Sequence, residues 1–239
     1  VLVSNHEYPD MVATLHARAR REGIALRTVN VPTRDGDSAE FVRALEAAVT
    51  GRTKLALLSH VSAWNGEVLP IAAACAVLRA RDVATCVDAA QSAGHLPVDV
   101  QELGCDFLAF SGHKMCGPTG IGVLYGRAEL LDAMPPWHGG GEMIVSVTLE
   151  KSVFKKAPHR FEAGTPNIAG AIGLGAAIEY IEGIGRAAIF EHDGRLAEYA
   201  MERLAELPGM RVLGPSGQRG ALVGFVMDGV HPHDLTTFA

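Results

Sequence analysis

The sequence CVDAAQ at residues 86–91 ends an apolar run in the carboxylate of Asp88, with the amide of Gln91 three residues further on. The sequence FSGHK at residues 110–114 ends a second such run and gathers a hydroxyl, an imidazole and an amine within four residues. In open α/β sheets, ligands bind outside the carboxyl ends of the strands. The two stretches therefore predict neighbouring strands whose ends share one pocket, with Asp88 and Lys114 in it.

Short β-rich runs alternate with amphipathic segments around these two stretches. We expect strands at residues 25–29, 55–60, 84–87, 107–110 and 121–125, and helices near residues 11–21, 39–49 and 71–81. This alternation is typical of βαβ units, and continuous apolar strands are expected where helices cover both faces of a sheet. The predicted fold class is α/β, with a mostly parallel central sheet flanked by helices.

The pattern changes in the second half of the chain. A helix-rich region extends from residue 168 to about 207 and is broken near residues 183–185, and two strands follow at residues 210–213 and 221–227. We expect a large domain over residues 1–180 and the start of a smaller α+β domain over residues 181–239. Neither end resembles a natural terminus, so we expect a longer parent protein that adds elements at both ends.

Composition excludes several function classes. The net charge of −6 provides no basic field for nucleic acid, and no run of 18 uncharged apolar residues predicts a membrane span. The four cysteines contain no C-x-x-C pair, and the sequence HPHD at residues 231–234 lacks a second ligand cluster, so no metal site is expected. We expect the cysteines to be small buried hydrophobes in a reducing compartment, which implies a cytoplasmic protein.

The residues at the two strand ends match the needs of pyridoxal 5'-phosphate (PLP). The amine of Lys114 can form a Schiff base, the carboxylate of Asp88 can keep the pyridine nitrogen protonated, and Ser111 and His113 can donate to the phosphate. Taken singly, a lysine after a strand is more often a solvated surface residue, and a strand-end aspartate is as often a helix N-cap. The order and spacing of both stretches together favour the cofactor site.

These two stretches resemble the class V aminotransferase family of fold-type I PLP enzymes. The segment PPWHGGGEMI at residues 135–144 and the segment RFEAGTPN at residues 160–167 narrow the resemblance. They are most similar to the SUF-type group II cysteine desulfurases and the related selenocysteine lyases. We interpret the Gly-rich part of the first segment as a tightly turned active-site loop, because it lacks the Lys-Ser/Thr of a phosphate-binding P-loop.

The resemblance implies a role for each strand-end residue. Lys114 is the Schiff-base lysine and the catalytic residue, and Asp88 pairs with the pyridine nitrogen. Gln91 bonds the phenolic oxygen of PLP, and Ser111 and His113 bind its phosphate. These five residues form the expected cofactor site within one chain.

Two further site residues follow from the same resemblance. Tyr8 falls where the desulfurases stack a histidine on the cofactor ring, and an aromatic side chain can stack but cannot shuttle protons near neutral pH as histidine does. Thr165 corresponds to a threonine that reaches the phosphate in the neighbouring subunit, which implies a homodimer. Ala63 stands where the desulfurases usually have Asn, so a contact is either lost or moved to Asn65.

The implied activity is that of a PLP-dependent cysteine desulfurase. Such an enzyme removes sulfur from L-cysteine to give L-alanine and an enzyme persulfide, which a sulfur-acceptor protein takes up for iron–sulfur cluster assembly. The persulfide-forming cysteine would follow residue 239, and Cys116, two residues after Lys114, is expected to be structural. Alternatives are another class V PLP enzyme (an epimerase, a transaminase or a kynureninase-like hydrolase) and a non-catalytic PLP-binding fragment.

Overall fold

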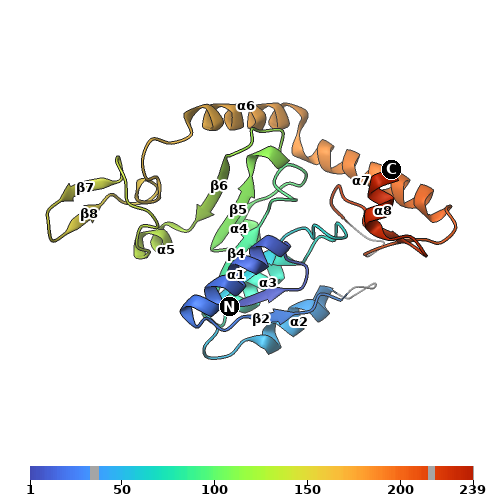
Figure 1. Ribbon diagram of the computed structural model, residues 1–239, viewed down its shortest axis with the longest axis horizontal. Helices are drawn as coiled ribbons and strands as arrows, with labels where there is room; N and C mark the ends of the chain where they lie inside the picture. The colour runs from blue at the N-terminus through green and yellow to red at the C-terminus, as the bar shows by residue number, and fades with distance from the viewer. Residues whose placement is uncertain (33–37, 215–218, 239) are drawn as a thin grey trace.

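The central element is a six-stranded sheet, seen in the computed structural model of Figure 1, which describes residues 1–32, 38–214 and 219–238. Within these residues the strand order is β2-β1-β3-β4-β5-β6, and all neighbours are parallel except β5 and β6. The strands are β1 (Leu2–Ser4), β2 (Arg27–Val29), β3 (Leu55–Ser59), β4 (Ala84–Asp88), β5 (Phe107–Ser111) and β6 (Gly122–Gly126). The predicted α/β class and its mostly parallel sheet are confirmed.

Helices follow most strands of this sheet, as the alternation predicts. They are α1 (Pro9–Glu22), α2 (Ser38–Ala48), α3 (Ile71–Arg79), α4 (Val100–Leu103) and α5 (Ala128–Ala133). Helix α1 ends where Gly23 adopts a left-handed conformation and donates its N–H to the carbonyl of Ala19. A glycine in this conformation is a common helix stop, because it satisfies a terminal carbonyl without a side-chain clash.

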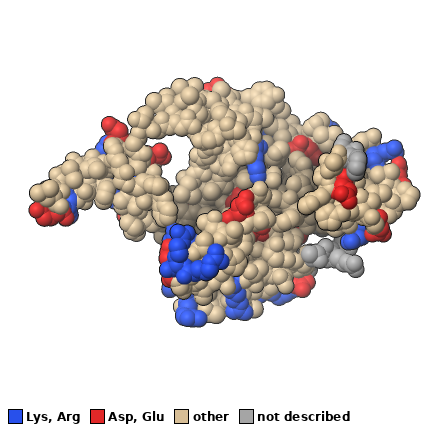
Figure 2. Space-filling model, in the orientation of Figure 1, with Lys and Arg blue, Asp and Glu red and all other residues tan. Residues whose placement is uncertain are grey.

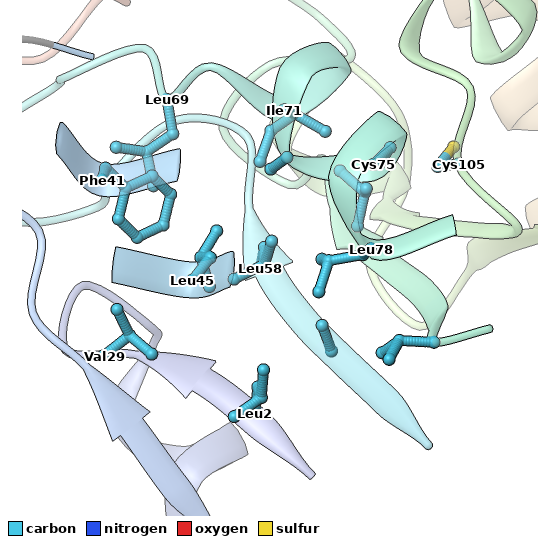
Figure 3. Close-up of a cluster of buried hydrophobic side chains, with 14 of the residues drawn as sticks. Leu2, Val29, Phe41, Leu45, Leu58, Leu69, Ile71, Cys75, Leu78 and Cys105 are labelled. Atoms are coloured by element: carbon cyan, nitrogen blue, oxygen red, sulfur yellow. The ribbon is translucent and has the colours of Figure 1, made fainter. Parts of the chain in front are cut away.

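The main hydrophobic core lies between α2, α3 and one face of the sheet (Figure 3). Phe41 and Leu45 of α2 pack there with Leu78 of α3 against Leu58 of β3, and all four are almost fully buried. Each such side chain contributes roughly 1.5–3 kcal/mol through its removal from water. This packing fixes the sheet and therefore the places where its strands end.

A long bent helical pair packs at the β5–β6 end of the sheet (Figure 1), where Phe110 of β5 contacts both this pair and the main core. Helix α6 (Ile168–Ile184) places Leu174 and Ile181 against Met115, and α7 (Arg186–Ala205) follows after a bend of 77°. The bend falls at Gly185, whose φ of 94° favours glycine, so the predicted break is confirmed. The domain boundary at residue 180 stays a prediction, since α6 continues through it.

The remaining elements form two antiparallel pairs and a terminal helix. The strands are β7 (Ile144–Val147) with β8 (Ser152–Phe154), and β9 (Met210–Val212) with β10 (Phe225–Met227); the helix is α8 (Pro232–Phe238). The β9–β10 pair confirms the two strands expected near the end of the chain. No single helix among the described residues is long and apolar enough to span a membrane, and only α6 and α7 taken together reach that composition.

Candidate active site

A cavity of about 480 Å³ opens at the carboxyl ends of β3, β4 and β5, beside the start of α1. Six of the seven site residues predicted from the sequence line it: Tyr8, Asp88, Gln91, Ser111, His113 and Lys114. Thr165 does not line the cavity; it is exposed after the turn at Gly164. One chain therefore brings together every predicted site residue except the one that the resemblance assigns to a neighbouring subunit.

Strand alternation explains how β4 serves both the core and the cavity. Thr85 and Val87 are buried on one side of β4, while Cys86 and Asp88 point to the other side and line the cavity. Asp88 pairs in register with Ser59 of β3, which also lines the cavity. Sequence reasoning missed Ser59 and Cys86, although the two-residue period leading to Asp88 was a signal for Cys86.

The turn after β5 directs Lys114 into the cavity. Residues Gly112–Lys114 form one 3₁₀ turn, in which the carbonyl of Gly112 accepts hydrogen bonds from the N–H groups of Met115 and Gly117. A β-carbon at Gly94 would lie 2.8 Å from the Cβ of Met115 and 3.0 Å from the carbonyl oxygen of Lys114. The absence of a side chain at Gly94 thus lets the segment after β4 approach the lysine turn.

The polar groups of this cavity are left available for a ligand. Asp88 Oδ1 accepts a hydrogen bond from the N–H of Ala90 at 2.8 Å, but its other carboxylate oxygen has no hydrogen-bond partner in the described ranges. Within the same ranges, the side chains of Gln91, Ser111, His113 and Lys114 also form no hydrogen bond or ion pair. One carboxylate oxygen, an amide, a hydroxyl, an imidazole and an amine thus converge with no hydrogen-bond partner among the described residues, and a few convergent polar groups in a cavity are typical of ligand sites.

This set fits PLP by its chemistry. The amine of Lys114 suits the aldehyde, the open oxygen of Asp88 suits a protonated ring nitrogen, and the side chains of Gln91, Ser111 and His113 suit the phosphate and phenolic oxygens. The Nζ of Lys114 lies 5.6 Å from the centre of the Tyr8 ring, so an aromatic face borders the same space.

The structure shows whether Asn65 can replace the contact that an asparagine at the position of Ala63 would make. Ala63 lines the cavity, whereas Asn65 does not; Asn65 is buried and accepts a hydrogen bond from the N–H of Glu67 at 3.1 Å. Its side-chain amide donates to the carboxylate of Glu67 at 3.3 Å. The contact is therefore lost on this wall, and Asn65 does not replace it.

The four cysteines divide into three environments. Cys75 and Cys105 are buried as expected, while Cys86 is half-buried in the cavity wall. Burial, with the nearby charge of Asp88, raises the pKa of the Cys86 thiol to about 11. The expectation of a buried Cys116 is wrong: this residue is exposed and has a φ of 60°, because the turn after Lys114 carries it outward.

A buried histidine supports the segment that carries Asp88 and Gln91. His60 Nδ1 lies 3.1 Å from Ser92 Oγ, and the N–H of His60 donates to the carbonyl of Asp88 at 2.8 Å. Burial lowers the pKa of His60. No motif in the sequence indicated this pair, because its residues lie on different strand-to-helix connections.

The fold is that of the fold-type I, PLP-dependent class, and the cavity lies at the carboxyl ends of its central strands. The Aminotransferase class-V model matches residues 1–239. The chain is 44% identical, over 239 residues, to a probable cysteine desulfurase of Streptomyces coelicolor, covering 98% of this chain and 56% of that protein. The chain therefore belongs to the class V aminotransferase family.

Solved structures agree with this assignment. The cysteine desulfurase CsdA of Escherichia coli superposes with a TM-score of 0.89 at 36% identity, covering 99% of this chain and 58% of that one. The cystine C–S lyase C-DES, solved with its product cysteine persulfide, gives a TM-score of 0.88 at 31% identity, covering 98% and 63%. Another C-DES structure holds glycine covalently linked to its PLP cofactor. The chain thus spans little more than half the length of these relatives.

Proposed function

We propose that the protein containing this chain is a PLP-dependent cysteine desulfurase that converts L-cysteine to L-alanine. The convergence of Lys114 and Asp88 in one cavity with the amide, hydroxyl and imidazole groups beside them carries this proposal. The similarity to cysteine desulfurases over almost the whole chain supports it. The chain itself contributes the cofactor-binding part of the enzyme.

When bound, PLP supplies an electron sink conjugated to the α-carbon of an amino acid. Lys114 would hold the cofactor through Nζ, and its amine, when free, would carry protons at the reacting carbons. Asp88 would keep a proton on the ring nitrogen, and Tyr8 would cover the ring and limit access of water. Gln91, Ser111 and His113 fix the orientation of the cofactor through its oxygens.

The sulfur-transfer step uses a cysteine outside this chain. The thiolate of that residue attacks the substrate sulfur, so an S–S bond forms while the C–S bond breaks, and a proton reaches the β-carbon to complete alanine. Cys86 lies in the cavity wall but stays a protonated thiol, since burial raises its pKa to about 11. A separate sulfur-acceptor protein would then receive the persulfide sulfur for iron–sulfur cluster assembly.

A carbon–sulfur lyase is the second candidate, favoured by Tyr8 and Ala63. Tyr8 cannot shuttle protons as histidine does, and Ala63 leaves the adjacent wall apolar. A lyase breaks a C–S bond by elimination: the sulfur leaves as hydrosulfide from cysteine or as a persulfide from cystine, and the remaining fragment hydrolyses to pyruvate and ammonia without an acceptor cysteine. The similarity to C-DES supports this alternative.

Product analysis with the full-length protein separates the two candidates. With L-cysteine and a thiol reductant, a desulfurase gives alanine and sulfide in equal amounts, whereas a lyase gives pyruvate. Because C-DES acts on cystine, the assay is repeated with L-cystine and no reductant. Formation of neither alanine nor pyruvate from either substrate would contradict both candidates, and would favour another class V reaction or a non-catalytic PLP-binding protein. A Lys114→Ala variant is the control for background chemistry.

We also propose that the protein is a homodimer. The β7–β8 hairpin projects from the body of the molecule (Figure 1), and Val145, Val147 and Leu149 on it are exposed. Figure 2 shows charged atoms at the tip of this arm and along its upper edge, with uncharged surface between them. An isolated two-stranded hairpin is only marginally stable in water, and a large exposed apolar patch usually marks an interface. We therefore propose that a second copy of the chain packs against this hairpin. Thr165, exposed and outside the cavity, is then available to a neighbouring cofactor.

A cytoplasmic location is part of the same proposal. All four cysteines are free thiols, which is the usual state in a reducing compartment. Fractionation of the source cells, followed by detection of the protein in the soluble or membrane fraction, tests it.

A further inference from the structure

A buried carboxylate lies directly beside the aromatic wall of the cavity. Glu7 is only 3% exposed, and its Oε1 accepts hydrogen bonds from Ser4 Oγ at 2.6 Å and from Ser4 N at 3.3 Å. Its Oε2 accepts a hydrogen bond from Ser59 Oγ at 2.6 Å. Glu7 thereby ties the turn between β1 and α1 to the carboxyl end of β3.

Burying the Glu7 carboxylate between these two segments costs free energy. In the part of the chain that the structure describes, no Lys or Arg forms an ion pair with Glu7, and burial raises its pKa despite the bonds from Ser4 and Ser59. Burying an acid without a cation is unfavourable, and apolar residues of similar volume often stabilise a core better. The Glu7 bonds hold the turn that carries Tyr8, together with backbone bonds from His6 N to Ser4 Oγ and from Asn5 N to the carbonyl of Val29.

Tyr8 has little else to hold it in place. The residue is 48% exposed and stands at the N-cap of α1, where its side chain makes no capping hydrogen bond. Pro9 at the first helical position and the bond from Met11 N to Tyr8 O fix its backbone on the C-terminal side. On the N-terminal side, the bonds of Glu7 are the nearest buried anchor.

We propose that Glu7 is a positioning residue that acts through Tyr8. By bonding Ser4 and Ser59, Glu7 holds the Tyr8 ring over the cavity, facing Lys114, where it covers the bound cofactor. Ser59 both lines the cavity and donates to Glu7, so this hydrogen bond joins the carboxyl end of β3 to the turn that carries Tyr8. This inference rests on the proposed cofactor site but not on the reaction catalysed there.

A double-mutant cycle in the full-length protein tests the proposal without measuring activity. The variants are Glu7→Gln, Tyr8→Ala and the two combined, and the readouts are the apparent Kd for PLP added to apoprotein and the visible circular dichroism of bound PLP. Glutamine replaces one acceptor oxygen with a donor, so one serine hydroxyl loses its partner. We expect Glu7→Gln to weaken PLP binding about tenfold when Tyr8 is present and to have no further effect beside Tyr8→Ala.

Two controls keep this outcome interpretable. Asp106→Asn neutralises another buried carboxylate, which does not line the cavity and accepts a hydrogen bond from Thr85 N at 2.8 Å. This variant should leave the dichroism of PLP unchanged. If Glu7→Gln does not fold, Ser59→Ala removes one bond to Glu7 and should show the same dependence on Tyr8. Equal effects with and without Tyr8 would overturn the inference and leave the proposed function intact. Failure of the wild-type protein to bind PLP would overturn both.

Discussion

Asp88 Oδ1 accepts a hydrogen bond from the backbone N–H of Ala90 at 2.8 Å, which fixes the carboxylate at the end of β4 with its second oxygen open to the cavity. The same local geometry recurs at Asp99, whose Oδ1 accepts from Gln101 N at 2.7 Å on the surface. The two aspartates share a turn type but not a chemical environment. They therefore form a matched pair for mutagenesis.

Asp88→Asn should preserve the fold and the bond to Ala90 while removing the negative charge beside the cofactor ring. We expect the rate of product formation from L-cysteine to fall by about 100-fold or more, because charge stabilisation in the reacting complex is lost. PLP should remain bound. Asp99→Asn is the control and should keep full activity. Equal activity of the two variants in steady-state assays would contradict the role given to Asp88.

The two cysteines nearest the lysine turn should react differently with iodoacetamide. Cys116 is exposed, while Cys86 is half-buried and its pKa is raised to about 11. Because the thiolate is the nucleophile, we expect alkylation of Cys86 at about pH 7.5 to be at least about tenfold slower than that of Cys116. Peptide mass spectrometry over time measures both rates. Unfolding in urea should remove the difference, and similar rates in the folded protein would contradict it.

His60 should make the protein less stable in mild acid. Burial lowers the pKa of His60 below the ordinary 6.5. Between the two pKa values the unfolded chain therefore binds a proton at His60 and the folded protein does not. The free energy of unfolding should therefore fall as the pH drops through 6.5 towards the lowered folded pKa, with a slope of at most about 1.4 kcal/mol per pH unit from this residue.

Urea titrations of wild type and His60→Gln across this range measure that slope. The variant should show a shallower pH dependence, whereas His16→Gln, which changes an exposed residue of α1, should follow the wild type. Parallel curves for His60→Gln and wild type would exclude the assigned role. Comparing slopes rather than absolute stabilities separates titration from the loss of the bond to Ser92.

A charge on the projecting hairpin should weaken self-association. Val145 is 66% exposed on β7, and Val145→Asp would place an unpaired carboxylate in the proposed apolar interface. We expect the dimer dissociation constant to rise at least about tenfold by sedimentation analysis. Val230→Asp, at an exposed valine near the end of the chain, should leave it unchanged. A monomeric wild-type protein would refute the dimer.

Local sequence pattern was enough to predict the part of the site that lies at strand ends. Asp88 and Lys114 follow apolar runs whose strands are adjacent and parallel, so their convergence is a consequence of topology. Tyr8 was placed by family resemblance, and the structure brings it to the same cavity from the start of α1.

Long-range polar contacts escaped prediction for a physical reason. Glu7 meets Ser59, and His60 meets Ser92, only after the sheet has set its register, and no local period marks a buried acid or imidazole. The exposure of Cys116 depends on its left-handed backbone conformation in the turn after Lys114, and the residue type of Cys116 gives no sign of that conformation. The residues that hold the site in shape are thus harder to find than those that line it.

The most direct test of the cofactor site is the identity of the lysine that holds PLP. Borohydride reduction of the full-length holoprotein followed by peptide mass spectrometry should find the pyridoxyl group on Lys114, and Lys114→Ala should carry none. The other lysines of the chain are Lys54, Lys151, Lys155 and Lys156. A pyridoxyl group on any of these, or a reducible attachment that survives in Lys114→Ala, would contradict the site described here.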